Sequence, residues 1–313
     1  LWHDCYEPRN FPIRGDLSVQ GLGIDKKEFE YLSQNIDMIF HNGGNVNFIY
    51  PYQALKPINV DGTREIIKLA FKDKIKPLHF VSTIAIWPMG AERVFDNDSS
   101  IDHNLHLNMA YDETKWVAEK MLLQAREYGL PVAIYRPGEV SGHSNTGMCI
   151  PQHFIYAILA GSLQIQALPI ANCLIDLTPI DYVAETMAYL SLQPQSFDKA
   201  LHVTNPQPIH TTQMYTWLRS IGYQFEEMTL DKWRSKLMNC DNFAENALYP
   251  YAAVLEEFHE VHLNFPKYDC EKTVQALEGS SIKCSAVDEN LLTTYIDFFV
   301  KVGYLPKQQR IVV

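Results

Sequence analysis

The sequence lacks several features by which particular classes of protein are recognised. Its six cysteines include no C-x-x-C pair, which is typical of reduced thiols in a cytosolic protein rather than of a disulfide framework or a zinc knuckle. Its apolar stretches, such as residues 154–159, are far shorter than the roughly 20 residues of a membrane-spanning helix. No basic and then apolar leader opens the chain. We therefore expect a cytoplasmic protein that does not enter a membrane.

Basic side chains are scarce relative to acidic ones. The 26 Lys and Arg residues oppose 37 Asp and Glu residues, for a formal net charge of -11. Because nucleic acids and anionic membranes require a basic face, we expect neither as a partner. Two histidine pairs, His103 with His106 and His259 with His262, have i,i+3 spacing but no evident third ligand. We expect no metal site.

The chain does contain short apolar runs that alternate with longer segments of helical spacing. This alternation predicts a doubly wound α/β fold with a Rossmann-type parallel sheet. The candidate strands are residues 11–14, 37–41, 78–82 and 132–135, and the candidate helices are residues 26–34, 59–71 and 111–128.

Beyond Gly138 the alternation loosens and prolines mark turns. A strand-like run at 200–204 lies among helices that we expect to begin near Asp181, Thr211 and Thr229. We therefore expect a smaller, mostly helical cap for the substrate. The expected organisation is a Rossmann part at 1–138, a cap segment at 139–175, a return to the Rossmann part at 176–204, and a carboxyl-terminal cap at 205–313.

A tyrosine with a lysine four residues later is the main chemical signal. On a helix the two side chains share one face, so the ammonium can lower the phenol's pKa from its usual value of about 10. The spacing occurs three times, as Tyr52 with Lys56, Tyr111 with Lys115, and Tyr268 with Lys272.

Context favours Tyr111 with Lys115. Ligands bind at the carboxyl ends of strands in open α/β folds, and this pair follows an apolar strand that ends in Ser82 and Thr83. In the first pair Pro57 directly follows the lysine, and the third pair lies late in the chain after Pro266. We expect both of these other pairs to be structural.

Several motifs together resemble the extended short-chain dehydrogenases. They are Gly15-Asp16-Leu17, residues 41–47, Asn59 to Thr63, Val81-Ser82-Thr83, Tyr111 with Lys115, and Arg136-Pro137-Gly138. Within that superfamily the chain is most similar to the thioester reductase domains that terminate nonribosomal peptide synthetases. Two further stretches carry this similarity, residues 46–52 and a tail from 277–282 through 303–306. Sugar epimerases and dehydratases share the catalytic pattern without these stretches.

The resemblance implies a role for each matching residue. Thr83 and Tyr111 are expected to hydrogen-bond the substrate carbonyl oxygen, with Lys115 holding the nicotinamide ribose and tuning Tyr111. Asn59 is expected to steady the strand geometry and a proton-relay water, with a helix N-cap as its alternative role. The cofactor-binding residues implied by the resemblance are Asp16 and Leu17 near the adenine, His41, Asn42, Gly43 and Gly44 along the ribose and pyrophosphate, Asn59, Lys115, and Pro137 and Gly138 at the nicotinamide.

One part of the family pattern is missing at the front of this sequence. A strand, a glycine-rich turn and a helix that receives the pyrophosphate normally come first, whereas this sequence opens just ahead of Asp16. The nearby Gly21-x-Gly23 is expected to be a turn. We therefore expect an amino-terminally truncated Rossmann part, and a chain that begins at Leu1 should bind NADPH poorly. The preference for NADPH over NADH is implied by the resemblance alone.

The implied reaction is reduction of an acyl or peptidyl thioester to an aldehyde, with further reduction to an alcohol left open. The expected partner is a peptidyl or acyl carrier protein with a phosphopantetheine arm, in an upstream domain of the same synthetase. One alternative is a sugar-nucleotide or small-carbonyl oxidoreductase. Another is a non-redox thioester-release or docking domain, which the missing glycine-rich unit favours and the retention of Thr83, Tyr111 and Lys115 opposes.

Overall fold

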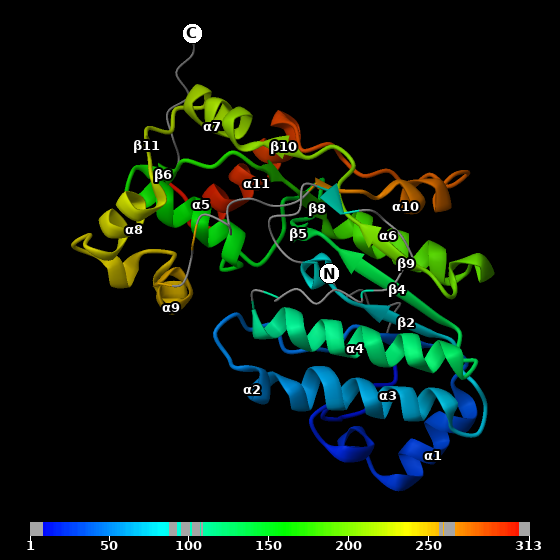
Figure 1. Cartoon of the computed structure of the whole chain (residues 1–313). Coiled ribbons are helices and arrows are strands. Elements are labelled where there is room, and N and C mark those ends of the chain that lie inside the picture. Colours follow the sequence, from blue (N-terminus) through cyan, green and yellow to red (C-terminus); the bar gives the residue numbers. More distant parts are fainter. Residues whose placement is uncertain are drawn as a thin grey trace. The chain divides into compact units, whose positions relative to one another are not determined.

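The computed structural model describes residues 9–87, 101, 107, 109–256, 259 and 267–306, with the backbone of 93–94. The chain divides into two compact units (Figure 1). The first unit is Leu1–Ser82, Met109–Ile134 and Phe197–Lys199, and the second is Thr83–Asn108, Tyr135–Ser196 and Ala200–Val313.

The first unit contains the beginning of a parallel sheet and the helices that cover it. Its elements are α1 (Lys26–Asn35), β1 (Ile39–His41), α2 (Tyr52–Lys56), a π-helical segment (Pro57–Asp61), α3 (Gly62–Phe71), β2 (Leu78–Val81), α4 (Ala110–Glu127) and the start of β4 (Val132–Pro137). Strands β1 and β2 are parallel, with Ile39 opposite Leu78. The Leu78 N–H donates to the Pro131 carbonyl at 2.9 Å, which places the start of β4 beside β2.

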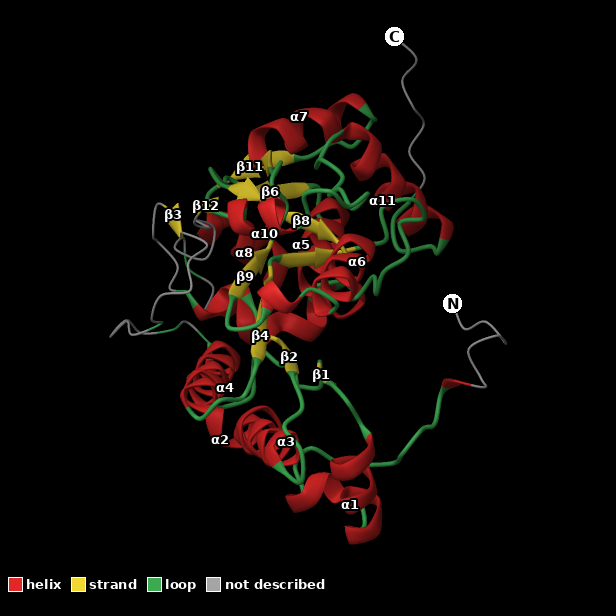
Figure 2. Cartoon of the chain, turned by 90° about the vertical axis from the view of Figure 1, so that its right-hand side faces the viewer, coloured by secondary structure: helices red, strands yellow, loops and turns green. Residues whose placement is uncertain are grey.

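Local sequence explains these elements. Asp25 and Glu28 form a capping box that begins α1. Apolar residues at helical spacing, among them Leu69 on α3 and Leu122 on α4, are buried. Helix α4 ends before Gly129, whose φ of 88° suits a glycine. Figures 1 and 2 both show α3 and α4 side by side.

The second unit contains short strands that alternate with its helices. They are β3 (Arg93–Val94), β5 (Glu139–Ser141), β6 (Ala167–Pro169), β7 (Leu174–Ile175), β8 (Leu177–Pro179), β9 (Ala200–Val203), β10 (Ile209–His210), β11 (Glu226–Met228) and β12 (Lys267–Tyr268). Hydrogen bonds join the larger sheet in the order β1-β2-β4-β9. The pairs β5 with β8, β6 with β11, and β3 with β12 are parallel, and β7 with β10 is antiparallel.

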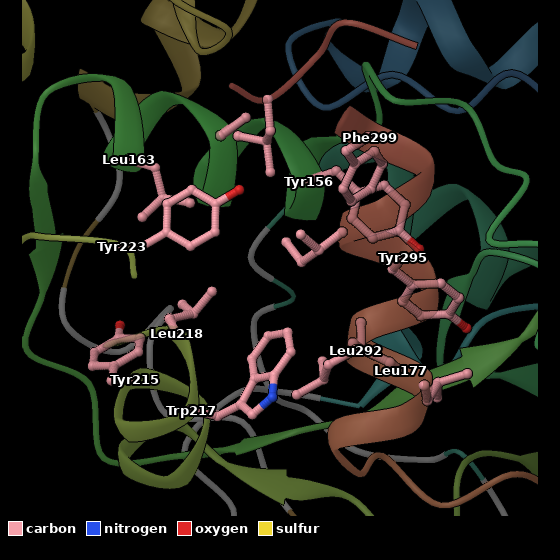
Figure 3. Close-up of a cluster of buried hydrophobic side chains, with 14 of the residues drawn as sticks. Tyr156, Leu163, Leu177, Tyr215, Trp217, Leu218, Tyr223, Leu292, Tyr295 and Phe299 are labelled. Carbon is pink, nitrogen blue, oxygen red and sulfur yellow. The ribbon is translucent and has the colours of Figure 1, made fainter. Parts of the chain in front are cut away.

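Helices supply the core of the second unit. They are α5 (Phe154–Gln164), α6 (Ile180–Ser191), α7 (Thr211–Ser220), α8 (Leu230–Met238), α9 (Ala252–Glu256), α10 (Glu271–Ala276) and α11 (Glu289–Lys301). Figure 3 shows aromatic and aliphatic side chains from α5, α7 and α11 meeting in one cluster. Tyr156 packs edge-to-face on Phe299 with ring centroids 4.8 Å apart. Burying a side chain such as Leu218 contributes roughly 1.5–3 kcal/mol.

Most predicted elements are confirmed. The strands expected at 37–41, 78–82, 132–135 and 200–204 are β1, β2, β4 and β9, and helices begin near Asp181, Thr211 and Thr229 as expected. The α/β fold class with a parallel sheet is confirmed. The organisation into a Rossmann part and a cap, with its four segments, stays a prediction.

One local prediction was wrong. Residues 11–14 form no strand, and Phe11 is 84% exposed, so these residues have neither a strand partner nor a face to bury. The helix expected at 59–71 is confirmed as the end of the π-helical segment and α3, and that segment also joins α3 to α2 through Pro57. The proline is tolerated because it begins that segment, where its missing N–H costs little.

Candidate functional site

Tyr111 and Lys115 lie in the first two turns of α4. The Lys115 Nζ donates to the Val81 carbonyl oxygen at 2.7 Å and lies 4.2 Å from the centroid of the Phe80 ring. The lysine is thereby fixed against the carboxyl end of β2, and two of its three ammonium donors are not needed for that bond. Phe48 packs edge-on against the Tyr111 ring, with centroids 6.2 Å apart.

Burial governs the electrostatics of this pair. It raises the pKa of Tyr111, and the neighbouring Asp112 raises it further. The net shift is therefore opposite to the expected lowering by the ammonium, because desolvation of the phenolate is its largest cause. Burial lowers the pKa of Lys115 to about 8 and raises that of Asp112 to about 7. Tyr111 thus stays protonated at neutral pH.

His41, at the end of β1, is a buried neutral imidazole. Burial and the charge of Lys115 lower its pKa to about 3. Its Nε2 lies 2.9 Å from the Thr63 hydroxyl oxygen, and that hydroxyl donates to the Asn59 carbonyl at 2.7 Å. Because the Thr63 proton is already used, His41 Nε2 must be the donor. Its Nδ1 is then an acceptor.

Asn59 ties together three segments of the first unit. Its Oδ1 accepts from the Asn45 N–H at 2.7 Å, and its Nδ2 donates to the Asn45 carbonyl at 3.1 Å and to the Thr114 hydroxyl at 2.9 Å. Asn59 is buried inside the π-helical segment. The alternative role of a helix N-cap was therefore wrong, because its side chain bonds outside its own helix.

The residues expected beside the adenine and pyrophosphate lie close together in the first unit. A Cβ added at Gly43 would come within 2.6 Å of Leu17 Cδ1, and one at Gly44 within 3.3 Å of Asn59 Oδ1. The Asp16 carboxylate accepts the Ser18 N–H at 2.8 Å and the Ser18 hydroxyl at 2.7 Å. Asn42 is exposed.

The Gly21-x-Gly23 segment forms a turn, as predicted. Gly21 and Gly23 have φ values of 67° and 65°, in the left-handed region that favours glycine. A Cβ at Gly23 would also come within 3.0 Å of the Asp16 nitrogen.

The other two tyrosine–lysine pairs have different surroundings. The Lys56 ammonium bonds both Asp61 carboxylate oxygens, at 2.9 and 2.7 Å. Tyr268 lies on β12 and Lys272 on α10, so these two side chains do not share one helix face. Tyr111 and Lys115, by contrast, lie on one helix, and that lysine bonds the end of a sheet strand.

Thr83, Pro137 and Gly138 belong to the second unit. The Thr83 hydroxyl oxygen caps a short helical turn by accepting the Ala85 N–H at 3.1 Å, which leaves the hydroxyl proton for another acceptor. Pro137 ends β4, and the Gly138 N–H donates to the Val203 carbonyl at 3.1 Å. A Cβ at Gly138 would overlap Asp176, 2.0 Å from its Oδ2.

Sequence reasoning missed a carboxylate cluster next to Gly138. Burial and the charge of Asp176 raise the pKa of Glu139 to about 7, and burial raises that of Asp176 to about 6. Asp176 Oδ1 accepts the Thr178 hydroxyl at 2.6 Å and the Asn205 N–H at 2.9 Å. His153 Nδ1 lies 3.3 Å from Glu139 Oε1. The only sequence signal was the position of Glu139 directly after Gly138.

The donor set of the first unit fits a nicotinamide nucleotide. Lys115 has ammonium donors beyond its bond to Val81 that could hold ribose hydroxyls. His41 presents an acceptor nitrogen, and Gly43 and Gly44 leave the backbone after β1 without side chains. No group of three or more His, Cys, Asp or Glu that could hold a metal occurs among the residues that the structure describes. His103, His106 and His262 lie outside those residues. Of the helices searched in the described part of the chain, none is long and apolar enough to cross a membrane.

Fold and site together define an α/β dinucleotide-binding protein with a tyrosine and a lysine on one helix face. The sequence profile of an NAD-binding family described as Male sterility protein matches residues 1–187. The chain belongs to this family. The expected similarity to thioester reductase domains of the extended short-chain dehydrogenase superfamily is confirmed.

Individual relatives are consistent with this family. The chain is 32% identical over 311 residues to a linear gramicidin synthase of Brevibacillus parabrevis, covering 97% of this chain and 6% of that protein. It is 33% identical over 237 residues to glycine betaine reductase ATRR of Emericella nidulans, covering 74% and 19%. It matches the crystal structure of the terminal R domain from the myxalamid PKS-NRPS biosynthetic pathway with a TM-score of 0.91 and 36% identity, covering 99% of this chain and 79% of that one. The chain spans less than a fifth of either curated relative.

Proposed function

We propose that this chain catalyses the nicotinamide-dependent reduction of a carrier-bound acyl or peptidyl thioester to an aldehyde. The observation that carries the proposal is the tyrosine–lysine pair of α4, in which the buried Lys115 is held on the Val81 carbonyl at the carboxyl end of β2. The 97% coverage of this chain by the alignment with a linear gramicidin synthase supports a substrate held by a synthetase.

Each residue has a defined task in this reaction. A bound nicotinamide supplies the hydride that reduces the acyl carbon. Tyr111, whose pKa is raised by burial, is the neutral donor to the oxygen that gains negative charge. Lys115 orients the nicotinamide ribose with the donors that Val81 does not use. Thr83 donates a hydrogen bond to the same oxygen as Tyr111 and keeps its proton. Loss of the thiol from the reduced carbon then gives the aldehyde, and the carrier keeps the thiol.

We propose the finer assignments as well, with the family resemblance as the support for the nucleotide, the partner and the residue roles. NADPH is the proposed nucleotide, and the cytoplasm is the proposed compartment. The proposed partner is a peptidyl or acyl carrier protein whose phosphopantetheine arm delivers the thioester. Asp16, Leu17, His41 and the segment 42–44 hold the adenosine end of the nucleotide, while Pro137 and Gly138 contact the nicotinamide.

The test is an assay of NADPH oxidation by the full-length protein with a carrier-bound acyl thioester. We expect one nucleotide to be oxidised per thioester cleaved when the aldehyde is released, and two when the aldehyde is reduced further to the alcohol, with the product identified by mass spectrometry. Release of the acid or of a cyclic product without NADPH oxidation would refute a redox function. Oxidoreduction of a sugar nucleotide would place the protein with the epimerase-like members of the superfamily instead.

A further inference from the structure

We propose that Thr114 is a positioning residue that couples the backbone after β1 to the first turn of α4 through Asn59. The inference deepens the proposed function, because the two segments that it joins carry the cofactor-binding glycines and Tyr111. Thr114 directly precedes Lys115 in the chain, and it is fully buried.

The hydrogen bonds around Asn59 fix the orientation of its amide. The Asn45 N–H is an obligate donor, so the atom 2.7 Å away must be the Asn59 oxygen. The Asn59 NH₂ group then has two protons, and both are used, one on the Asn45 carbonyl at 3.1 Å and one on the Thr114 hydroxyl at 2.9 Å. A flipped amide would lose both bonds to Asn45.

The Thr114 hydroxyl is oriented in the same way. It donates to the Tyr111 carbonyl oxygen at 2.7 Å, so towards Asn59 it presents a lone pair. Rotation of the hydroxyl would break one of these two bonds inside a buried region, where an unpaired polar group costs free energy. The position of the Tyr111 backbone is thus linked to the amide of Asn59.

Close packing transmits this link to the glycines. Gly44 packs closely against Asn59, since an added Cβ would lie 3.3 Å from Asn59 Oδ1. The backbone carbonyl of Asn59 accepts the Thr63 hydroxyl, which in turn accepts from His41. A displacement of Asn59 should therefore also shift His41 and the backbone of residues 44–45.

The π-helical segment explains why Asn59 can make these bonds. Between α2 and α3 the helix widens over Pro57–Asp61, and Asn59 lies at its centre. Such single π-helical turns are frequent at functional sites, because they redirect a side chain away from ordinary helical register. Here the redirected side chain bonds Asn45 and Thr114.

A hydroxyl that only bonds its own helix would have no such effect. Thr216 on α7 provides that comparison, since its hydroxyl donates to the Thr212 carbonyl at 2.8 Å and is exposed. Thr114→Val and Thr216→Val each remove one such hydroxyl with little change of shape. Only Thr114→Val removes an acceptor of Asn59, so only it should disturb the 44–45 backbone and Tyr111.

The first measurement is hydrogen–deuterium exchange of the full-length protein, which requires no turnover. In Thr114→Val, the peptide that contains the Asn45 amide should exchange faster than in the wild type, and Thr114→Ser should restore the protection. Thr216→Val should leave that peptide unchanged. Unchanged exchange in Thr114→Val would overturn the inference.

The second measurement separates binding from turnover. We expect Thr114→Val to lower kcat about 10-fold and to weaken nucleotide affinity several-fold, with Thr114→Ser within about 2-fold of the wild type. Combined with Asn59→Ala, it should add little to the loss caused by Asn59→Ala alone, because residues of one network are not additive. If the double variant lost activity by the product of the two single losses, the proposed coupling of Thr114 to Asn59 would be overturned. If no thioester is reduced but exchange and nucleotide affinity respond as described, the proposed function fails and the positioning role stands.

Discussion

The Lys115 Nζ donates a 2.7 Å hydrogen bond to the carbonyl oxygen of Val81, the last residue of β2. This bond joins α4 to the end of a sheet strand at the place where open α/β folds bind their ligands. It also keeps a cation in a buried site, and burial lowers the pKa of that cation to about 8. The lysine is therefore positioned for binding at a cost in stability.

Replacing Tyr111 by Phe should slow thioester reduction by about 10²-fold or more, because its phenol is the proposed proton donor. Nucleotide affinity should change little, since the aromatic ring and its contact with Phe48 remain. The measurements are steady-state kinetics and nucleotide titration of the full-length protein.

Tyr52→Phe and Tyr268→Phe are the matched controls for this experiment. Tyr52 precedes a lysine that is paired with Asp61, and Tyr268 lies on β12. Both variants should retain wild-type turnover. Full activity of Tyr111→Phe would remove this phenol from the mechanism.

Replacing Lys115 by Met should stabilise the protein in a pH-dependent way. The folded pKa is about 8 against a reference value of 10.5, so below pH 8 the folded state bears a cost of about 3 kcal/mol for the buried charge. That cost is relieved as the pH rises from the folded towards the unfolded pKa. The lost bond to Val81 removes about 1 kcal/mol of the gain.

Urea unfolding at several pH values tests this prediction. The advantage of Lys115→Met should shrink by up to about 1.4 kcal/mol per pH unit above the folded pKa. Lys301→Met on the exposed end of α11 is the control, because it removes no buried charge. A difference that does not vary with pH would contradict the desolvation of Lys115.

His41 should remain neutral, as the tautomer protonated on Nε2, throughout the pH range of activity. Its pKa is lowered to about 3, and the Thr63 hydroxyl, which donates to Asn59, can only accept from Nε2. Nitrogen-15 NMR of the imidazole should show this tautomer without titration between about pH 5 and 8. Thr63→Val should remove the preference for that tautomer. Protonation near pH 6.5 would contradict the burial of the ring.

Replacing Gly138 by Ala should destabilise the protein by about 1–3 kcal/mol, the usual cost of overpacking. The new methyl group would lie 2.0 Å from Asp176 Oδ2, and Asp176 is itself held by Thr178 and Asn205. Thermal and urea unfolding measure the loss. Added to Asp176→Ala, the same substitution should cost much less. If Gly138→Ala destabilised the wild type and the Asp176→Ala variant equally, the contact with Asp176 would not be the cause of the loss.

The order of strands and helices could be predicted because it is encoded in local periodicity. Strand β2 and helix α4 have apolar residues at the spacing that their burial requires. The choice of Tyr111 over the two other tyrosines also rested only on the neighbouring elements, since Pro57 directly follows Lys56 and Tyr268 lies late in the chain after Pro266. That choice stays a prediction.

The network around Asn59 could not be predicted in this way. Its bonds join residues 14 and 55 positions apart in the chain, so no local pattern contains them. The sign of the Tyr111 pKa shift failed for a similar reason, because desolvation depends on what packs around the phenol. Helical spacing predicts only that a lysine lies one turn away, and it does not predict how far the phenol is desolvated.

A carrier-bound thioester should be reduced with a higher kcat/KM than the same acyl group on coenzyme A or a short thiol. The proposed catalytic group acts on one carbonyl, so contacts with the carrier and its arm lie away from the reacting carbon. Binding energy from such remote contacts positions the thioester, and its loss lowers kcat as well as affinity. NADPH oxidation measured with each donor decides this, with the Tyr111→Phe variant as the blank for non-enzymatic reduction. Equal specificity constants for all donors would show that the carrier is not recognised, even where the thioester itself is reduced.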